Sequence, residues 1–489
     1  MKNMVIRITQ IFTLIVAFLM ISACAVNPVT GKKQLNLMGE QQEIQLGASY
    51  DPQVVAQFGL YQNDAIQKFI NEKGQEMAKI SHRPQLKWTF RVVDSPVVNA
   101  FAVPGGYVYF TRGILAHFNN EAEFAGVLGH EIGHVTARHA ASQYTKQTLG
   151  QVLFIGGLIV SKEFREFADV AQQSLGLLFL KFSRDDESQS DELGVEYSTK
   201  IGYDAVEMAD FFRTLSRLSA KSGASDIPTF MSTHPNPMDR YNKVGKMANE
   251  WQGKSEIANY EVNRDEYLRM IDGLIYGEDP RQGYVENNRF YHPELKFQYP
   301  IPVGWQTQNS ASQVQMAPKD GKALMILTLS PDSDLQTAAQ NIVQQFELTP
   351  VDSRSVTVNG MPAIAMLNDQ ITQDPNTGKE SALRIQTYCI QYNGAIYVIH
   401  GLAARQDFQR YQNQFNQTMK GFNKLTDASK INVMPEKVKI VSVKSNGTFQ
   451  QALNGYQVPS ARQEEFAILN GMELKDQVQA GQLIKIIGK

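Results

Sequence analysis

The chain has 489 residues, of which 43% are hydrophobic and 20% charged, a composition that is ordinary for globular domains. Its formal net charge of −2 at pH 7 gives no general attraction to nucleic acid, so a nucleic-acid-binding function is not expected. The length is enough for about three domains. The chain shows no low-complexity segment and no clear internal repeat.

Residues 1–23 have the pattern of a targeting segment. Lys2 and Arg7 give it a positively charged start, and residues 11–21 form its apolar core. An uncleaved membrane anchor is the competing interpretation. The targeting role is favoured because the apolar run is shorter than the about 20 residues that a membrane span needs.

Residues 21–24, with the sequence Ile-Ser-Ala-Cys, resemble a bacterial lipobox. The resemblance implies that residues 1–23 are a lipoprotein signal peptide and that Cys24 is the lipidated first residue of the mature chain. Ala25 resembles the residue found in lipoproteins of the outer membrane, so we expect a lipid-anchored protein that faces the periplasm. The other cysteine, Cys389, then has no partner within the chain and is expected to be a buried structural thiol.

The residues that follow are expected to form helices and then strands. Residues 42–48 and 65–80 have amphipathic helical spacing, and residues 86–94 alternate like a strand. Residues 107–111 form a second predicted strand, which we place at the edge of its sheet. Two interpretations stay open there: an extended peptide substrate adds to this edge, or the edge is an ordinary one after a glycine turn.

Residues 121–140 (EAEFAGVLGHEIGHVTARHA) are expected to form one helix that contains the pattern His-Glu-x-x-His. Because residues four apart lie one turn above each other, His130 and His134 can bind the same Zn²⁺ ion. Glu131 lies beside that face and can act as general base on a water molecule, which is the arrangement of a zinc peptidase. A surface helix with two chance histidines is the alternative, but burying unpaired histidines in this otherwise apolar helix would be costly.

Two glycines within the same helix indicate a close packing partner. Gly129 and Gly133 each cost roughly 1 kcal/mol of helix stability relative to alanine. Glycine at such positions is typical of close approach by another backbone. We therefore expect another backbone to pack closely against this helix.

Two apolar stretches, residues 149–160 and 175–182, follow the His-Glu-x-x-His pattern. Neither is long enough for a membrane span, so buried core helices are expected. The alternative is a mobile apolar helix near the cleft that touches substrate or the membrane surface. Residues 203–217 are expected to form a further amphipathic helix.

A catalytic zinc site needs a third protein ligand and leaves the fourth position for water. The acidic segment at residues 183–191 offers Glu187 as that ligand. Asp191 lies four residues later, on the same helical face, and can accept the second ring N–H of a ligand histidine. A solvated acidic helix start is the alternative, but the position after the His-Glu-x-x-His pattern favours the metal role.

Together, these motifs resemble metallopeptidase family forty-eight, the family of HtpX- and BepA-like endopeptidases. The resemblance rests on HEIGH at residues 130–134, SRDDESQSD at 183–191, NAFAVPGG at 99–106 and STHPNP at 232–237. It covers roughly the N-terminal half of the chain and implies a gluzincin fold that holds one Zn²⁺ per chain. Ser190 stands where the family usually has alanine, and we expect this small replacement to be tolerated.

The resemblance also implies roles for two residues near the end of this region. His234, in the proline-rich loop at residues 232–237, becomes either a fourth zinc ligand of a resting state or a hydrogen-bond donor to the transition state. Arg240 is the competing candidate for the group that stabilises the oxyanion. Either residue would act on charge that develops at the scissile carbonyl.

A polar linker at residues 277–283 precedes a second unit. Residues 286–426 are expected to form a small α+β domain. Its predicted strands are residues 295–299, 323–329, 383–391 and 395–400, and its predicted helices are residues 335–346 and 408–419. The unit carries no metal-binding or nucleophile pattern, so we assign it no activity and expect a platform for a substrate or partner.

The tail, residues 436–489, resembles a LysM-like module with the order strand, helix, helix, strand. Its strands are expected at residues 438–443 and 483–487 and its second helix at residues 464–469. The resemblance implies contact with peptidoglycan. A packing or partner-binding module is an equally good interpretation.

The predicted fold class is therefore α+β: a mainly helical gluzincin domain with a small sheet at residues 24–275, then the small α+β domain and the LysM-like module. The predicted function is a zinc-dependent endopeptidase of the bacterial envelope that cleaves misfolded or stalled periplasmic or outer-membrane proteins. Its expected partners are those polypeptides, the membrane through the lipid anchor, peptidoglycan and the outer-membrane assembly machinery. Two alternatives remain: a chaperone or assembly scaffold with a closed zinc site, and a peptidoglycan-associated binding protein.

Overall fold

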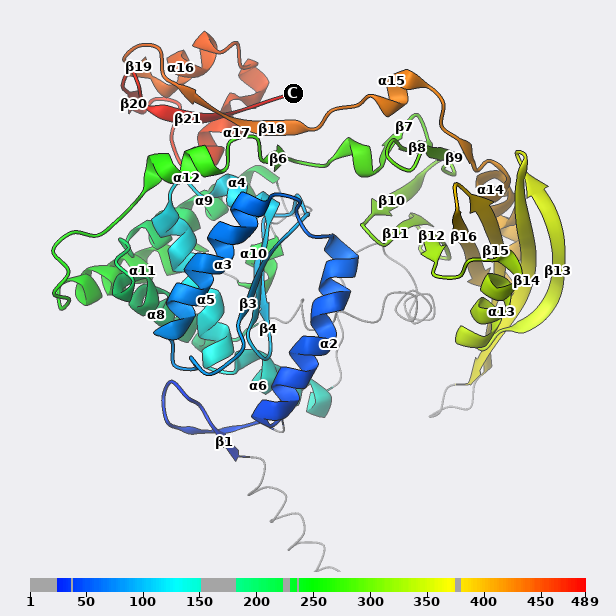
Figure 1. Cartoon of the computed structure of the whole chain (residues 1–489), viewed down its shortest axis with the longest axis horizontal. Helices are drawn as coiled ribbons and strands as arrows, with labels where there is room; N and C mark the ends of the chain where they lie inside the picture. Colours follow the sequence, from blue (N-terminus) through cyan, green and yellow to red (C-terminus); the bar gives the residue numbers. More distant parts are fainter. Residues whose placement is uncertain (1–23, 37, 151–181, 223–228, 235–236, 374–379) are drawn as a thin grey trace, which may run out of the picture.

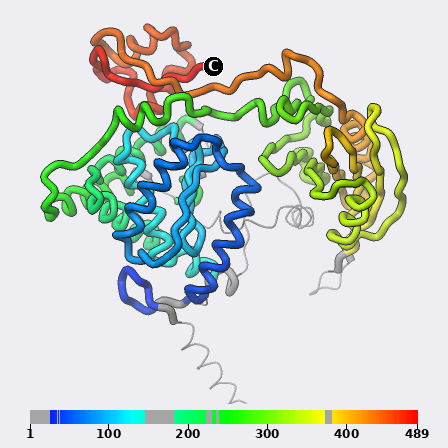
Figure 2. The backbone as a smooth tube through the Cα atoms, viewed as in Figure 1, coloured from blue at the N-terminus to red at the C-terminus, as the bar shows by residue number. Residues whose placement is uncertain are grey.

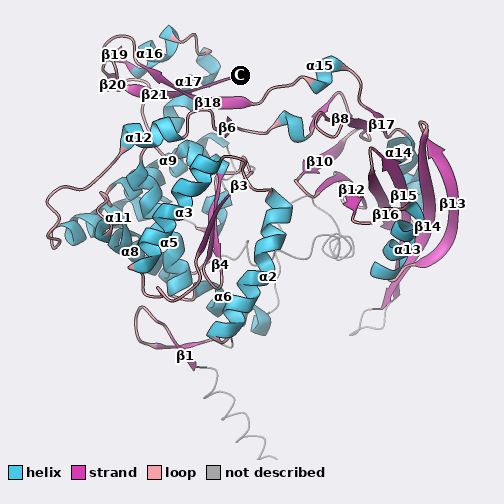
Figure 3. Cartoon of the chain, in the orientation of Figure 1, coloured by secondary structure: helices cyan, strands magenta, loops and turns pink. Residues whose placement is uncertain are grey.

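The structure is a computed structural model that describes residues 24–36, 38–150, 182–222, 229–234, 237–373 and 380–489. Figure 3 shows a helix-rich part, a part dominated by strands, and a small mixed module at the C-terminal end. The predicted targeting segment and most of the two predicted apolar stretches lie outside the described residues. Among the helices of the described residues, none is both long and apolar enough to cross a membrane.

The helix-rich part is formed by the N-terminal half of the chain (Figure 1). It begins with the hairpin β1 (Cys24–Val26) and β2 (Lys33–Leu35). Its helices are α2 (Glu40–Phe58), α3 (Asp64–Lys79), α4 (Arg112–His117), α5 (Glu121–Thr136), α6 (His139–Gly150), α8 (Arg184–Lys200), α9 (Glu207–Ser222), α10 (Thr229–Thr233), α11 (Pro237–Gln252) and α12 (Arg264–Met270). The amphipathic patterns at residues 42–48, 65–80 and 203–217 thus predicted helices correctly, with shifted ends.

A three-stranded sheet accompanies these helices, in the order β3 (Thr89–Val93), β5 (Tyr107–Thr111), β4 (Ala100–Val103). β5 is the central strand, parallel to β3 and antiparallel to β4, so the prediction that residues 107–111 form an edge is wrong. The sequence misleads because residues 100–103 are too short a run to show strand alternation. Within the described residues, β4 is an outer strand of this sheet.

Helices α5 and α8 cross at the glycines of α5. A Cβ atom on Gly129 would lie 3.0 Å from the Cα atom of Gly194, and one on Gly133 would lie 3.3 Å from the Cα atom of Ser190. The predicted close approach of another backbone is therefore confirmed, and the partner is α8. This contact brings the first turns of α8 directly against the His-Glu-x-x-His segment.

Helix α5 ends at Thr136, short of the end predicted from the sequence. Arg138 has a φ angle of 62°, in the left-handed region, and turns the chain into α6, which begins at His139. That region is unfavourable for a residue with a side chain. The Arg138 guanidinium compensates by donating to Glu43 Oε1 at 2.5 Å and to the Met38 carbonyl at 2.7 Å. The predicted single helix is therefore two.

The strand-rich part forms a seven-stranded antiparallel sheet in the order β10-β11-β12-β16-β15-β14-β13, beside a smaller sheet of β17-β9-β8-β7. Its elements are η2 (Pro280–Gln282), β7 (Tyr284–Glu286), β8 (Arg289–His292), β9 (Phe297–Pro300), β10 (Trp305–Asn309), β11 (Gln313–Pro318), β12 (Ala323–Ser330), α13 (Leu335–Gln345), β13 (Thr349–Val358), β14 (Met361–Gln373), β15 (Glu380–Tyr392), β16 (Ala395–Ala404), α14 (Phe408–Lys420), β17 (Asn423–Lys424) and α15 (Ala428–Ile431). Helices α13 and α14 pack against separate cores, and the predicted strands and helices are confirmed.

Cys389 lies in β15 and is fully buried in the core beneath α13. Burial raises the pKa of its thiol to about 12, so the thiolate does not form near neutral pH. The prediction of a buried structural thiol is confirmed.

The tail returns to the helix-rich part after the strand-rich part is complete (Figure 2). Its elements are β18 (Glu436–Ser442), β19 (Gly447–Thr448), α16 (Phe449–Gly455), α17 (Ser460–Leu469), β20 (Gln477–Val478) and β21 (Leu483–Gly488). β18 pairs with β21 on one side and with β6 (Ile275–Tyr276), from the end of the helix-rich part, on the other. Val438 and Ile484 of the tail lie in the same hydrophobic core as Val127 and Leu128 of α5.

Lys485 in β21 fixes this docking with its buried amino group. Its side chain is fully buried, and Nζ donates hydrogen bonds to the carbonyl oxygens of Ala116 at 2.9 Å and Phe118 at 2.8 Å. Burial lowers the pKa of Lys485 and raises that of Glu123 in α5. The tail therefore contacts the turn between α4 and α5, immediately before the helix that carries the metal-binding pattern.

Replacing this amino group is expected to destabilise the helix-rich part. Lys485→Met leaves two buried carbonyl groups without a donor, at a cost of about 1–3 kcal/mol, and should lower the melting temperature by roughly 2–10 °C. Lys439→Met, on the exposed face of β18, is the matched control and should have the melting temperature of the wild-type protein. Thermal unfolding of the three full-length proteins measures the effect. Equal melting temperatures would show that the tail is not held in this way.

Candidate active site and metal centre

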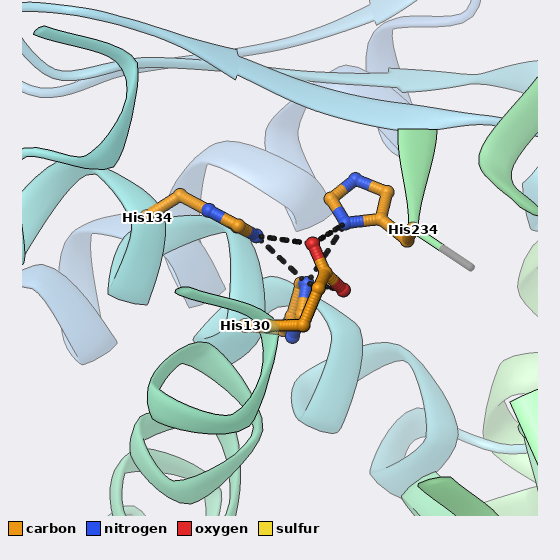
Figure 4. A group of neighbouring side chains, drawn as sticks. His130, His134 and His234 are labelled. Atoms are coloured by element: carbon orange, nitrogen blue, oxygen red, sulfur yellow. Dashed lines mark hydrogen bonds and ion pairs between the residues drawn. The ribbon is translucent and has the colours of Figure 1, made fainter. Parts of the chain in front are cut away.

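Four potential metal ligands meet in the core of the helix-rich part. They are His130, His134, Glu187 and His234, all buried, and their ligand atoms lie within 4.8 Å of one another. The Nε2 atom of His130 is 3.0 Å from Nε2 of His134 and 3.2 Å from Nδ1 of His234. Glu187 Oε1 is 2.8 Å from the same His234 nitrogen. Figure 4 shows the three imidazole rings directed at a common point.

Each ligand reaches this point from a different part of the fold. His130 and His134 lie one turn apart on α5, and Glu187 lies in the first turn of α8, whose start is capped by the Ser183 side chain. His234 directly follows α10 and donates its backbone N–H to the Phe230 carbonyl at 2.8 Å. The predicted proline-rich loop therefore begins as the end of a short helix.

Asp191 and Arg240 surround the ligands on their outer side. Asp191 Oδ1 is 3.0 Å from Nδ1 of His130, which leaves Nε2 of that ring for the cluster. Arg240 donates to both oxygens of Asp191, at 2.9 Å and 2.5 Å, and its Nη1 is 3.1 Å from Glu187 Oε2. The guanidinium thus contacts the two carboxylates and holds them in place beside His130.

Glu131 lies next to the ligand cluster and is 1% exposed. Its Oε1 atom is 3.7 Å from Nε2 of His234. Glu131 Oε1 has no hydrogen-bond partner in the described residues, whereas Glu187 Oε2 pairs with Arg240. Buried carboxylate oxygens are rarely left without a hydrogen bond, so Glu131 Oε1 is available to a further group such as a water molecule. Two imidazoles and one carboxylate are the donor set of a catalytic zinc site, so the residues present fit that metal.

The protonation states of these groups suit metal binding. Burial lowers the pKa of His130 to about 4 and that of His134 well below its ordinary value, so both rings are neutral near pH 7. Burial would raise the pKa of Asp191, but Arg240 and His130 hold it at about 2. Burial raises the pKa of Glu131 to about 7, the range in which a carboxylate both accepts and releases a proton.

Residues 64–248 match the family model described as peptidase family M48. These residues form an M48 peptidase domain. The mitochondrial metalloendopeptidase OMA1 of Arabidopsis thaliana is 34% identical over 175 residues, which are 36% of this chain and 34% of that protein. The beta-barrel assembly-enhancing protease is 29% identical over 217 residues in Yersinia pestis and 26% identical over 218 residues in Escherichia coli K12. These two alignments cover 43% of this chain and 44% of each protease.

The chain thus spans less than half the length of these curated relatives. Within that limit, the match identifies the domain as a zinc metalloendopeptidase domain. Its metal is zinc, and the buried group of three histidines and one glutamate is where the M48 domain can hold it.

One residue of this M48 site was not predicted from the sequence. His139 is buried, and its Nδ1 atom lies 3.1 Å from Nδ1 of His134. The sequence contains one signal for it, a third histidine five residues after His134. On the single helix predicted for residues 121–140, this histidine would point away from the cluster. The left-handed residue Arg138 turns it back.

Proposed function

We propose that the whole protein is a zinc-dependent endopeptidase of the bacterial envelope that cleaves misfolded or stalled periplasmic or outer-membrane polypeptides. The observation that carries the proposal is the buried ligand cluster with the Glu131 carboxylate beside it, whose Oε1 has no hydrogen-bond partner. The choice of substrate is supported by the relatives named beta-barrel assembly-enhancing protease. By the same analogy, the outer-membrane assembly machinery is a candidate partner.

In the proposed mechanism, His130, His134 and Glu187 hold the metal. Zinc, when bound, supplies Lewis acidity for a water molecule and for the peptide carbonyl. Glu131 accepts the proton of the attacking water and delivers it to the leaving amine. Asp191 accepts the Nδ1–H of His130 and so keeps Nε2 of that ring free to bind.

An extended substrate can add to the outer strand β4. The only strand paired with β4 in the described residues is β5, so the other side of β4 offers backbone groups to a peptide. Strand addition recognises backbone rather than side chains and therefore suits unfolded polypeptides of varied sequence. We therefore propose residues 100–103, instead of residues 107–111, as the edge that binds the peptide.

The contacts of His234 support a closed resting site, which keeps a scaffold or chaperone role as the second candidate function. Its Nδ1 atom lies among the ligand atoms, where a water molecule would have to enter. An enzyme opens this site when substrate binds, whereas a scaffold keeps it closed. The contacts of Arg240 with Asp191 and Glu187 favour a positioning role for that residue over oxyanion binding.

Proteolysis of an unfolded polypeptide tests the proposal. The purified full-length protein is incubated with a reduced, unfolded polypeptide and with the same polypeptide in its folded form, with and without a chelator. We expect cleavage of the unfolded form alone, and none in chelator. Tight zinc binding with no cleavage of either form would favour the scaffold.

The proposed location is the outer membrane, with the chain anchored through lipid on Cys24 and facing the periplasm. Cys24→Ser should block lipidation and leave a precursor that retains residues 1–23 or is cleaved elsewhere. Mass spectrometry of the N-terminus of protein from membranes measures this. A wild-type mature chain with an unmodified Cys24, or without it, would remove the lipoprotein assignment.

For the tail, the contacts with the M48 domain favour a packing role over glycan binding. Arg217 of α9 donates to the Met472 carbonyl at 2.7 Å and pairs with Glu464 at 2.9 Å, so α9 contacts both α17 and the loop after it. Sedimentation with purified peptidoglycan separates the two roles. Binding by the wild-type protein would support the cell-wall function.

A further inference from the structure

The two helix-borne zinc ligands have different outer partners. His130 meets the Asp191 carboxylate through Nδ1 at 3.0 Å. In the part of the chain that the structure describes, no carboxylate faces Nδ1 of His134; the atom facing it is Nδ1 of His139, at 3.1 Å. The ring centroids of His134 and His139 are 5.0 Å apart, and the two ring planes are inclined at 75°. His139 is 2% exposed, so this contact lies inside the core.

The direction of this hydrogen bond follows from the direction of the His134 ring. Its Nε2 atom points into the ligand cluster, 3.0 Å from Nε2 of His130 and 3.5 Å from Glu187 Oε1. A neutral imidazole that binds metal through Nε2 carries its proton on Nδ1. That N–H must donate, and the only role left for Nδ1 of His139 in this contact is to accept.

The surroundings of His139 favour that tautomer on both sides of its ring. On the other side, Nε2 of His139 faces Gln189 Oε1 at 2.9 Å and Asp186 Oδ1 at 3.7 Å, and both oxygens accept a proton donor. Next to Nδ1, the fully buried Ser190 hydroxyl lies at 3.2 Å and can donate to the same lone pair. The acceptors at Nε2 place the proton of His139 on that atom, which leaves Nδ1 to accept from His134.

We propose that His139 is a positioning residue for zinc: it accepts the Nδ1–H of His134 and fixes that ring with Nε2 directed at the metal. Gln189 and Ser190 hold His139 in the accepting tautomer. Ser190, which replaces the alanine usual in this family, is thereby part of the ligand support and not merely a tolerated change. This inference rests on the zinc site of the proposed function but not on peptide cleavage.

Zinc affinity tests the proposal without any measurement of turnover. His139→Ala removes the acceptor and should weaken zinc binding about 10–100-fold, the usual loss when the outer partner of a ligand histidine is removed. His139→Asn should bind zinc within a few-fold of wild type, because Oδ1 of asparagine is as many bonds from Cα as Nδ1 of histidine and also accepts. Ser190→Ala should have the smallest effect. Competition with a chromogenic chelator gives the dissociation constants.

A matched control separates hydrogen bonding from general loss of packing. His400→Ala removes an equally buried histidine from β16 in the strand-rich part and should leave zinc affinity unchanged. Thermal unfolding of the metal-free variants shows which of them remain folded. Long-range ¹H–¹⁵N NMR of the imidazole nitrogens in the zinc-loaded wild type should place the His139 proton on Nε2.

Three results would overturn the proposal. The first is His139→Ala binding zinc as tightly as wild type. The second is His139→Asn binding as weakly as His139→Ala while both remain folded, which would assign the effect to ring volume. A His139 proton found on Nδ1 would contradict the direction of the hydrogen bond. If His139→Ala loses zinc affinity and wild type cleaves nothing, only the proposed peptidase function fails.

Discussion

Glu131→Gln is expected to retain zinc and to lose roughly 10²–10⁴-fold in turnover of an unfolded polypeptide, the contribution of a well-placed general base. The amide has nearly the same shape as the carboxylate but cannot accept the proton of the attacking water. Glu131 lies beside the ligand cluster rather than in it, so its loss leaves the metal ligands in place. Metal analysis gives the zinc content of the variant, and one rate measurement on the unfolded polypeptide gives its turnover.

Variants of the three proposed metal ligands show how loss of zinc differs from loss of the general base. His130→Ala, His134→Ala and Glu187→Ala each remove one ligand and should lose both zinc and turnover. If Glu131→Gln lost zinc as these variants do, Glu131 would be a ligand. If Glu187→Ala bound zinc as tightly as wild type, the third ligand would have to be another residue, and His234 would be the nearest candidate.

His234→Ala is expected to raise turnover severalfold while zinc content stays almost unchanged. The His234 ring lies among the ligand atoms, with Nδ1 at 2.8 Å from Glu187 Oε1 and 3.2 Å from Nε2 of His130. The ring there occupies the place that the attacking water needs. Its removal opens that place and leaves three ligands for the metal, which is enough for a catalytic site. Turnover per bound zinc measures the change.

The same variant separates this interpretation from its opposite. If His234 instead donates a hydrogen bond to the developing oxyanion, its loss should cost about 10²–10³ in kcat. Its Nε2 atom, 3.7 Å from Glu131 Oε1, lies close enough to the reacting groups for that role once the ring moves. A rate that stays the same within error would contradict both interpretations of His234.

The sequence predicted most where local spacing carries the information. The pattern His130-Glu131-x-x-His134 places three groups on one helix, and Gly129 and Gly133 indicated the close packing partner that α8 provides. Both depend only on helical periodicity and on the absence of a Cβ atom. The helices of the helix-rich part and the strands of the strand-rich part follow from the same kind of local pattern.

The features that the sequence did not predict depend on contacts between distant segments or on a turn of the chain. Residues 100–103 are a strand only because they pair with β5, and so short a segment has no pattern of its own. The end of α5 depends on Arg138, whose left-handed conformation is stabilised by Glu43, nearly a hundred residues away. His139 reaches His134 only through that turn. The order of the seven strands likewise depends on pairings across the whole unit.

Zinc titration of the metal-free protein tests most directly whether the chain is a zinc-dependent peptidase with Glu131 as its base. The chelator-stripped full-length protein is mixed with increasing zinc, and bound metal and turnover of an unfolded polypeptide are measured on the same samples. We expect no turnover without metal and a rise in turnover that parallels bound zinc and levels off at one zinc per chain. Glu131→Gln should bind the same amount of zinc without turnover. Equal turnover in metal-free and zinc-loaded protein, or full turnover by Glu131→Gln, would contradict this expectation.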